Sequence, residues 1–298
     1  MFLSEEDVRA LLRMEELIPA MAEALRELSS GDVQQPIRQV LPVTDHNGFF
    51  AVMPAYAASR AALGAKLVTF YPNNEPVPTH HAMIQLFRPG TGEPLVTMDG
   101  RLITEMRTAA VSAVATDLLA RRDVSVLAIL GSGVQARSHL EALRLVRNFS
   151  EVRVWSPRNA GKFAREFNLT QKTSAEETVR GADVIVVATS ATTPVLLGEW
   201  LSPGTHINAV GATRPTWREL DDAVVERARI YVESREAAMK ESGDVMAAGK
   251  IFAEIGEVVA GAKPARQSAE EITLFKSVGV AIEDIVAADL VYRRATAG

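Results

Sequence analysis

The segment VLAILGSGVQARSHL constrains the fold more than any other part of this sequence. Residues 124–130 form a run typical of a buried strand, and residues 134–146 have the apolar spacing of a helix. Between them, Gly131, Gly133 and Ala136 form a G-x-G-x-x-A pattern, which is the dinucleotide-binding fingerprint when it joins a strand to a helix. We expect its backbone N–H groups to hold a pyrophosphate at the helix N-terminus; the alternative is an ordinary tight turn. The residues expected to contact the cofactor are Gly131, Gly133, Val134 and Gln135.

Strand and helix patterns alternate through the rest of residues 121–274. After the helix at 134–146, a strand pattern at 152–155 is followed by a short helix at 160–167. Alternation of this kind predicts βαβ units and a parallel, doubly wound sheet of the Rossmann type. The further predicted strands are residues 183–189, 206–210 and 229–233.

The part of the chain before this region has a different pattern. Short apolar runs over residues 36–100 are separated by turn signals, of which Asn47-Gly48 and residues 89–92 (PGTG) are the clearest. Strands joined by such short turns pair in antiparallel fashion. We therefore predict a mostly antiparallel sheet here, within an α+β domain.

Helical patterns flank this predicted sheet. Ser4 with Asp7 forms an N-cap signal, and apolar residues at helical spacing then continue as one helix to Gly31. A second helix is predicted to begin at Thr104, its N-cap. Residues 272–293 also show helical spacing, which predicts a C-terminal helix.

Composition excludes several classes of protein. Of 298 residues, 47% are hydrophobic and 23% charged, which excludes a disordered or fibrous chain. The absence of cysteine excludes disulfides, thiolate metal sites and cysteine nucleophiles. The formal net charge is −5 with no long basic run, so neither nucleic acid nor a membrane surface is an expected partner. No signal-peptide pattern or apolar run of membrane-spanning length is present, so we expect a cytoplasmic protein.

Histidine gives no indication of a metal site. His80 and His81 are adjacent, and adjacent residues on a strand point to opposite faces. The other histidines (His46, His139 and His206) are scattered along the chain. We therefore expect no metal ion.

The end of the second strand of the predicted parallel sheet bears on the choice of dinucleotide. NAD-binding proteins place an acidic residue there, which binds the ribose 2′-hydroxyl, but this sequence continues Trp155-Ser156-Pro157-Arg158. Ser156 can donate a hydrogen bond to a 2′-phosphate, and Arg158 can offer its guanidinium. We therefore favour NADPH, with NADH binding more weakly; the alternative is that Arg158 is simply solvated.

Three basic residues outside this region stand in unusual settings. Arg38 begins a predicted strand, Lys66 lies inside the run GAKLVTF, and Arg107 falls in the first turn of the helix predicted to begin at Thr104. A cation in a first turn opposes the helix macrodipole, and lysine in an apolar run is uncommon unless it is paired or reaches solvent. Each residue alone is compatible with an exposed side chain, and their spacing does not show that they converge.

Eight segments match, in order, segments of one known family. They are QPIR (35–38), MPAY (53–56), KLVTFY (66–71), MDG (98–100), RTAAVSA (107–113), INAVGATRPTWRELDD (207–222), KESGDV (240–245) and FKSVGVAIED (275–284). Together they resemble the ornithine cyclodeaminase/mu-crystallin family over nearly the whole chain. The similarity is closest to the mu-crystallin branch, whose members are ketimine reductases.

This resemblance implies a homodimer with two domains in each chain. Residues 1–120 with 275–298 would form an α+β domain for substrate binding and dimerisation. Residues 121–274 would form a Rossmann dinucleotide-binding domain. Further residues that would line the cofactor are Thr189, Val210 and Gly279.

The matching positions also imply a substrate site. Arg38, Lys66 and Arg107 would hold the carboxylate of a small anionic substrate. Ornithine cyclodeaminases carry an aspartate where this chain has Thr213 and a glutamate where it has Ala51. A threonine forms hydrogen bonds but cannot act as a base near neutral pH, and ketimine reductases have a small hydroxyl residue there as well. The resemblance therefore implies reduction of a C=N bond.

The hypothesis is NADPH-dependent reduction of small cyclic ketimine carboxylates to cyclic L-amino acids. Lys66, Arg107 and Thr213 would act in catalysis, with Lys66 as a candidate proton source and Thr213 hydrogen-bonded to the imine nitrogen or to a water. Two other family activities stay open, reductive amination of a 2-oxo acid and ornithine cyclodeamination. A different class also stays open, a protein that binds NADPH and thyroid hormone, as mu-crystallins do.

Overall fold

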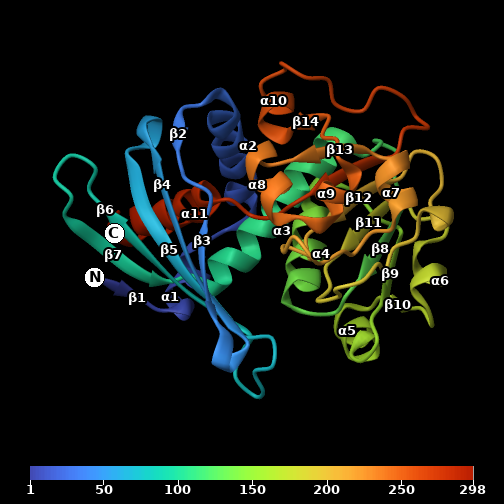
Figure 1. The fold of residues 1–298 in the computed structure, drawn as a ribbon, viewed down its shortest axis with the longest axis horizontal. Helices are drawn as coiled ribbons and strands as arrows, with labels where there is room; N and C mark the ends of the chain where they lie inside the picture. The colour runs from blue at the N-terminus through green and yellow to red at the C-terminus, as the bar shows by residue number, and fades with distance from the viewer. Residues whose placement is uncertain (298) are drawn as a thin grey trace. The chain divides into compact units, whose positions relative to one another are not determined.

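The computed structural model describes residues 1–297 as two compact units (Figure 1). Unit 1 is Met1–Arg107 with the chain from Gly279 onward, and unit 2 is Thr108–Val278. The two divisions fall inside helix α3 (Arg101–Leu119) and just before the last helix, α11 (Ala281–Thr296). The chain therefore leaves unit 1, builds the whole of unit 2, and returns to finish unit 1.

Unit 1 is built on a seven-stranded sheet. Its elements before α3 are β1 (Phe2–Leu3), α1 (Glu5–Leu11), α2 (Met14–Ser30), β2 (Val33–Gln34), β3 (Gln39–Val43), β4 (Gly48–Ala57), β5 (Ala62–Phe70), β6 (His80–Phe87) and β7 (Pro94–Asp99), with 3-10 turns at Thr44–His46 and Ala58–Arg60. The spatial order is β1-β7-β6-β5-β4-β2, and β3 also pairs with β4. The pair β1–β7 is parallel and the other pairs are antiparallel, which confirms the predicted sheet.

Helix α11 packs against β4, β5 and β6 and against α2. Along β5, burial alternates, so that Ala62, Gly64 and Lys66 share the covered face of the strand. A Cβ atom at Gly64 would lie 3.0 Å from Ile285 Cδ1 of α11, so the glycine allows the helix to approach the sheet closely. Lys66 is therefore held inside unit 1 by the same alternation that builds its core.

The first predicted helix is two helices. Ser4 caps α1 in a capping box with Asp7, as the sequence predicts. However, Leu12 and Arg13 adopt extended backbone conformations, and the Arg13 guanidinium donates to the carbonyl oxygens of Arg9 and Leu12. The prediction of a continuous helix was wrong because apolar spacing persists across this break.

The predicted start of α3 at Thr104 was also wrong. The helix begins at Arg101, whose backbone N–H donates to Asp99 Oδ1 at 2.8 Å. The Thr104 hydroxyl donates to the carbonyl oxygen of Gly100 at 2.8 Å, the pattern of a threonine inside a helix. Arg107 therefore lies beyond the first turn, and the macrodipole gives no reason for its position.

Unit 2 is built on an eight-stranded parallel sheet with the order β10-β9-β8-β11-β12-β15-β13-β14. Its strands are β8 (Val126–Leu130), β9 (Glu151–Trp155), β10 (Thr170–Gln171), β11 (Val184–Val187), β12 (His206–Ala209), β13 (Arg229–Val232), β14 (Ala253–Glu254) and β15 (Thr273–Lys276). Its helices after α3 are α4 (Val134–Val146), α5 (Ala160–Phe167), α6 (Ala175–Val179), α7 (Asp222–Arg227), α8 (Arg235–Glu241), α9 (Gly243–Ala248) and α10 (Ile255–Val259), with a 3-10 turn at Gly198–Trp200. This arrangement confirms the predicted α/β class with a doubly wound parallel sheet. Within residues 1–297, no helix is both long enough and apolar enough to cross a membrane.

The C-terminal segment 272–293 is not one helix as predicted. Its first part is β15, a fully buried strand between β12 and β13, and α11 follows only at Ala281. A buried strand is apolar on both faces, so a short apolar run of this kind does not distinguish strand from helix.

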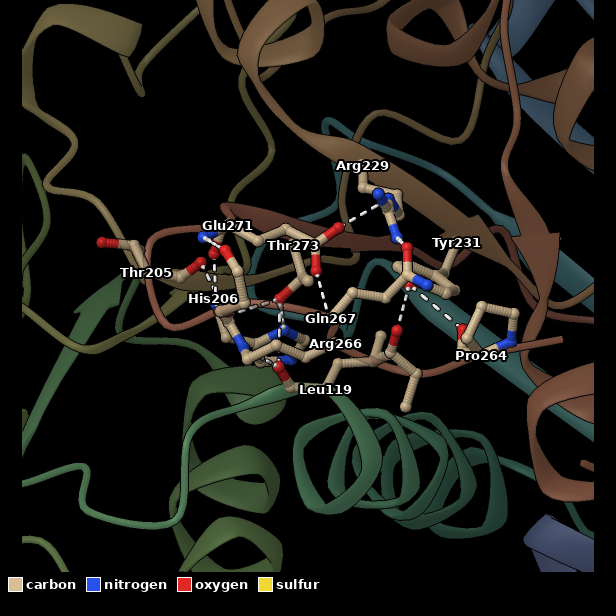
Figure 2. A network of polar contacts seen from close by, with 12 residues as sticks. Leu119, Thr205, His206, Arg229, Tyr231, Pro264, Arg266, Gln267, Glu271 and Thr273 are labelled. Atoms are coloured by element: carbon tan, nitrogen blue, oxygen red, sulfur yellow. Dashed lines mark hydrogen bonds and ion pairs between the residues drawn. The ribbon is translucent and has the colours of Figure 1, made fainter.

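A polar network holds the long segment between α10 and β15 against the rest of unit 2 (Figure 2). Arg266 donates to the carbonyl oxygen of Leu119, the last residue of α3, at 2.7 Å and to Thr273 Oγ1 at 3.0 Å. The ring nitrogen His206 Nδ1 lies 2.9 Å from the same Thr273 hydroxyl. Burial, with a smaller contribution from Arg266, lowers the pKa of His206 to about 3, so this ring is neutral in the folded protein.

Candidate active site

The turn between β8 and α4 accepts only glycine at its first position. Gly131 has a φ of +121°, and a Cβ atom there would lie 2.2 Å from the carbonyl oxygen of Ala188. Its N–H donates to the carbonyl oxygen of Trp155 at 2.9 Å. The turn is therefore held tightly between the ends of β8, β9 and β11.

Gly133 leaves room in front of helix α4. It is the N-cap residue, no side chain caps the helix, and a Cβ atom at Gly133 would meet no atom within 4 Å. The backbone N–H groups of the first turn thus lie beside open space, with Val134 exposed and Gln135 half-buried. Ala136 is fully buried, as close packing of the helix on the sheet requires. These residues fit the pyrophosphate of a dinucleotide.

Ser156 lies beside this turn. It follows β9, and its hydroxyl forms a 2.8 Å hydrogen bond with the Ser132 hydroxyl of the glycine-rich turn. Arg158 is exposed two residues further on. The end of β9 thus presents a hydroxyl and a guanidinium, and no carboxylate occurs between Trp155 and Arg158.

The remaining predicted cofactor residues of unit 2 follow the neighbouring strands. Thr189 comes after β11, and its N–H and hydroxyl both donate to Glu219 Oε1, at 2.9 and 2.6 Å. Val210 follows β12, and its N–H donates to the carbonyl oxygen of Val187 at 2.9 Å. The structure therefore brings Thr189 and Val210 to the carboxyl edge of the sheet, the same edge as the glycine-rich turn.

The three predicted cations converge in unit 1 on the segment from Gly279 to Asp284. Lys66 Nζ donates to Asp284 Oδ2 at 2.5 Å, and Arg107 Nε donates to Asp284 Oδ1 at 3.0 Å. Arg38 donates to the carbonyl oxygen of Gly279 at 2.5 Å. Gly279 has a φ of +76°, and a Cβ atom there would lie 2.5 Å from an Arg107 nitrogen, so glycine is required beside this guanidinium.

Two carboxylates of this cluster were not predicted from the sequence. Asp284 bridges Lys66 and Arg107, and Glu283 Oε2 accepts from Arg107 at 2.6 Å. Both carboxylates are completely buried in the first turn of α11. Acidic residues in a first turn are common on exposed helices, so the only signal was their place in the apolar segment FKSVGVAIED.

Burial and neighbouring charges set the protonation of this cluster. Burial lowers the pKa of Lys66 to about 8, and the positive charges of Arg107 and Arg38 act in the same direction, against the attraction of Asp284. Burial alone would raise the pKa of Asp284, but Arg107 and Lys66 outweigh it and hold that pKa below its usual range. At neutral pH the cluster therefore contains an ammonium paired with a carboxylate.

The other two predicted site residues lie in different units. Thr213 is half-buried in unit 2, directly after Ala212, which has a φ of +51°. Gly279, predicted to line the cofactor, belongs to unit 1 with the cation cluster. Among residues 1–297, no group of three or more His, Cys, Asp or Glu side chains is placed to hold a metal ion.

A family model described as the ornithine cyclodeaminase/mu-crystallin family matches residues 1–298. The chain belongs to this family. Ketimine reductase mu-crystallin of Mus musculus is 53% identical over 98% of this chain and 96% of its own length.

Solved structures of family members agree with this assignment. One is Thermococcus litoralis Delta(1)-pyrroline-2-carboxylate reductase in complex with NADH and L-proline, with a TM-score of 0.95 and 41% identity over 99% of this chain and 97% of that one. Another is an archaeal alanine dehydrogenase dimer with bound NAD, with a TM-score of 0.93 and 37% identity over 100% of this chain and 96% of that one. The family predicted from the sequence is thus confirmed.

Proposed function

We propose that this chain is an NADPH-dependent ketimine reductase, which reduces the C=N bond of small cyclic imine carboxylates to cyclic L-amino acids. The observation that carries the proposal is the convergence of Arg38, Lys66 and Arg107 in unit 1. Relatives named for reduction of ketimines and of Delta(1)-pyrroline-2-carboxylate support the reaction class.

The three cations bind and orient the substrate carboxylate. Guanidinium and ammonium groups form charge-assisted hydrogen bonds with carboxylates, each contributing on the order of 1.5–3 kcal/mol when well aligned. Asp284 holds Lys66 and Arg107 before substrate arrives, so little reorganisation is needed on binding. The carboxylate then fixes the position of the adjacent imine carbon.

Reduction adds a hydride to the carbon and a proton to the nitrogen of the C=N bond. When bound, the reduced nicotinamide supplies the hydride. Lys66 is mostly protonated at neutral pH, since its pKa is about 8, and can donate the proton. Thr213 hydrogen-bonds the imine nitrogen or a water, and as a threonine it does not serve the base chemistry of cyclodeamination.

The preference for NADPH rests on Ser156 and Arg158. Both offer donors to a 2′-phosphate, and no carboxylate is present there for a 2′-hydroxyl. The similar structures named above hold NADH and NAD, so the test compares kcat/KM with NADPH and NADH. Equal kcat/KM values with the two dinucleotides would contradict the preference for NADPH. The substitution Arg158→Ala should reduce this preference about tenfold.

A homodimer formed through unit 1 is part of the proposal. The sheet face opposite the core exposes Leu67 and Met83, which lie directly across from each other on β5 and β6 with 41% and 48% of their surface accessible. Leu41 of β3 lies on the same face by its register and is exposed as well. An apolar sheet face suits a second copy of the chain, and the similar alanine dehydrogenase is a dimer. Light scattering of the wild type and a Leu67→Glu/Met83→Glu variant tests this: the wild type should be a dimer and the variant a monomer.

One assay tests the reaction itself. NADPH oxidation is followed with five- and six-membered cyclic imine carboxylates, with linear imines, and with pyruvate plus ammonia. The proposal requires turnover of a cyclic imine above the other substrates. Preferred turnover of pyruvate with ammonia would support an amino-acid dehydrogenase instead, as in the similar alanine dehydrogenase, and NADPH binding without turnover would support a ligand-binding protein.

Thr213→Asp tests the choice of branch. The substitution restores the carboxylate that cyclodeaminases carry at the aligned position. Appearance of ornithine cyclodeamination would show that this position decides between deamination and reduction.

A cytoplasmic location and the roles of the two domains also belong to this proposal. The absence of cysteine from the chain supports the cytoplasmic location.

A further inference from the structure

Unit 2 contains a second group of buried charges, which has no role in the proposed reaction. It consists of Glu219, Asp244 and Lys276, and none of these residues has accessible surface. Lys276 ends β15, and Asp244 lies in the first turn of α9. Removing charges from water costs several kcal/mol for each ion. Such a group persists only where its partners compensate for that cost, so its contacts are informative.

Glu219 joins the loops that follow two neighbouring strands. Its Oε1 accepts the N–H and the hydroxyl of Thr189, after β11, at 2.9 and 2.6 Å. The same oxygen lies against Gly211, after β12, where a Cβ atom would be only 2.4 Å away. The carboxylate thus fixes the first loop by hydrogen bonds and the second by contact.

Lys276 holds the second loop from the adjacent strand. Its ammonium donates to the carbonyl oxygen of Gly211 and lies 3.7 Å from Asp244 Oδ2. Asp244 Oδ1 in turn accepts the backbone N–H groups of Glu219 and Leu220, at 3.2 and 3.1 Å. The three charged residues and the two loops therefore form one connected set of contacts.

We propose that Glu219 and Lys276 are positioning residues for the dinucleotide, which hold the loops at Thr189 and Gly211 in the shape that binds it. The inference rests on the proposed function, because it is the family resemblance that implies that these loops line the cofactor. In open parallel sheets, ligands bind beyond the carboxyl ends of the strands, and both loops lie at that edge with the glycine-rich turn.

The charge of Glu219 controls how firmly the loop at Thr189 is held. Burial raises the pKa of Glu219 to about 7 and nearby Asp244 acts in the same direction, against Lys276 and the Thr189 hydrogen bonds. Arg218 also faces this group, with its Nε 3.7 Å from Asp244 Oδ1. An ionised carboxylate accepts hydrogen bonds more strongly than a neutral one. A loop that is held for a larger fraction of the time gives a tighter apparent Kd, so the affinity for dinucleotide should rise with pH through about 7.

The experiment compares Glu219→Gln with Glu236→Gln, a control at an exposed residue of α8. The Kd values of NADPH and NADH are measured by fluorescence at about pH 6 and about pH 8.5; NADH is included because it lacks the 2′-phosphate, which titrates near pH 6. Glu219→Gln should bind both dinucleotides about tenfold more weakly than the control at the higher pH, and within about twofold of it at the lower pH. A role in packing alone would give the same deficit at both pH values and would overturn the proposal.

Asp244→Asn provides a second test that does not depend on the folding of Glu219→Gln. The amide keeps an acceptor for the N–H groups of Glu219 and Leu220 and removes the negative charge that raises the pKa of Glu219. The midpoint of the pH dependence of Kd should move to lower pH, and an unchanged midpoint would overturn the proposal. If the wild type bound neither dinucleotide, the proposed function would fail together with this inference. If the wild type bound NADPH and reduced imines, and both variants behaved like the control, only the positioning role would fail.

Discussion

Two arginines, one in each unit, use their guanidinium groups in different ways. Arg107 of unit 1 donates to two carboxylates, Asp284 at 3.0 Å and Glu283 at 2.6 Å. Arg266 of unit 2 donates to main-chain carbonyl oxygens, among them that of Leu119 at 2.7 Å, and to a threonine hydroxyl (Figure 2). Arg107 is buried and Arg266 is half-buried, so neither guanidinium is freely solvated and exposure alone does not explain their roles.

The groups that accept hydrogen bonds from these two arginines distinguish their roles. A guanidinium on the last carbonyl group of a helix satisfies a backbone acceptor and stabilises the helix end, as Arg266 does at α3. A buried cluster of cations and carboxylates adds little net stability, because desolvation offsets the attraction. The proposed binding of a substrate carboxylate would give the cluster around Arg107 a role other than stability. The comparison predicts that changes in the Figure 2 network affect stability alone, whereas loss of a cation in unit 1 lowers turnover and also stability, because it leaves a buried carboxylate without its partner.

Arg107→Ala should have the largest effect. We expect kcat/KM for a cyclic imine to fall about 1000-fold, since two charge-assisted contacts and the orientation of the substrate are lost. The Kd of NADPH should stay within about twofold of the wild-type value. Urea unfolding and the variant Arg107→Lys, measured in parallel, separate loss of the contact from loss of the fold. Retained activity in folded Arg107→Ala would contradict the clamp.

Arg266→Ala should lower stability and leave turnover nearly unchanged. Loss of its contacts leaves the carbonyl oxygen of Leu119 without this donor, and we expect the free energy of unfolding to fall by about 3 kcal/mol. At a temperature where the variant is folded, kcat/KM should stay within about threefold of the wild type. A large loss of turnover without loss of stability would break the comparison.

His206→Gln should reveal the same network through its pH dependence. The folded-state pKa of His206 is about 3, below the usual 6.5, so the folded protein binds fewer protons than the unfolded chain between these values. This stabilisation is complete above about pH 6.5 and is lost as the pH falls. Relative to His206→Gln, the free energy of unfolding of the wild type should fall by about 1.6 kcal/mol between pH 6.5 and pH 5. The free energies of unfolding come from urea titrations of both proteins at the two pH values. An equal change in the wild type and in His206→Gln would refute this prediction.

Lys66→Arg should have the smallest effect at neutral pH and the clearest effect at alkaline pH. Wild-type kcat/KM should fall above about pH 8, where Lys66 loses its proton and its charge. An arginine stays charged but does not give up a proton, so the variant should be about tenfold less active near pH 7, where a water donates the proton instead, and should lack this alkaline decline. The same decline in both enzymes would assign the titration to another group.

Local signals predicted the bounds of an element best where turn or capping residues mark its ends. Helices α4 and α5 span the predicted ranges, because the glycine-rich turn and Asn168 in a left-handed conformation mark their ends. Thr104 was wrongly predicted to be an N-cap, because a threonine before an apolar run resembles a cap even when it lies inside a helix. The short run that forms β15, before α11, was wrongly predicted to be helical, because a strand buried on both faces has no period of two.

The site required the structure for a different reason. Arg38, Lys66 and Arg107 come from distant parts of unit 1, and only the fold brings them to the segment from Gly279 to Asp284. The resemblance supplied their positions but gave no role to Glu283 or Asp284. A buried carboxylate and a solvated one are identical in sequence, and tertiary contact alone separates them.

The order of segments along the chain has a consequence for biosynthesis. Asp284 follows Lys66 by 218 residues and Arg107 by 177, and the whole of unit 2 is translated in the interval. The sheet of unit 1 thus emerges from the ribosome early, with its apolar face bare and its buried lysine lacking a counter-ion. Unit 1 cannot complete its core before α11 is synthesised. A chain truncated after Val278 should therefore be retained by chaperones or degraded, although the parallel sheet of unit 2 is complete.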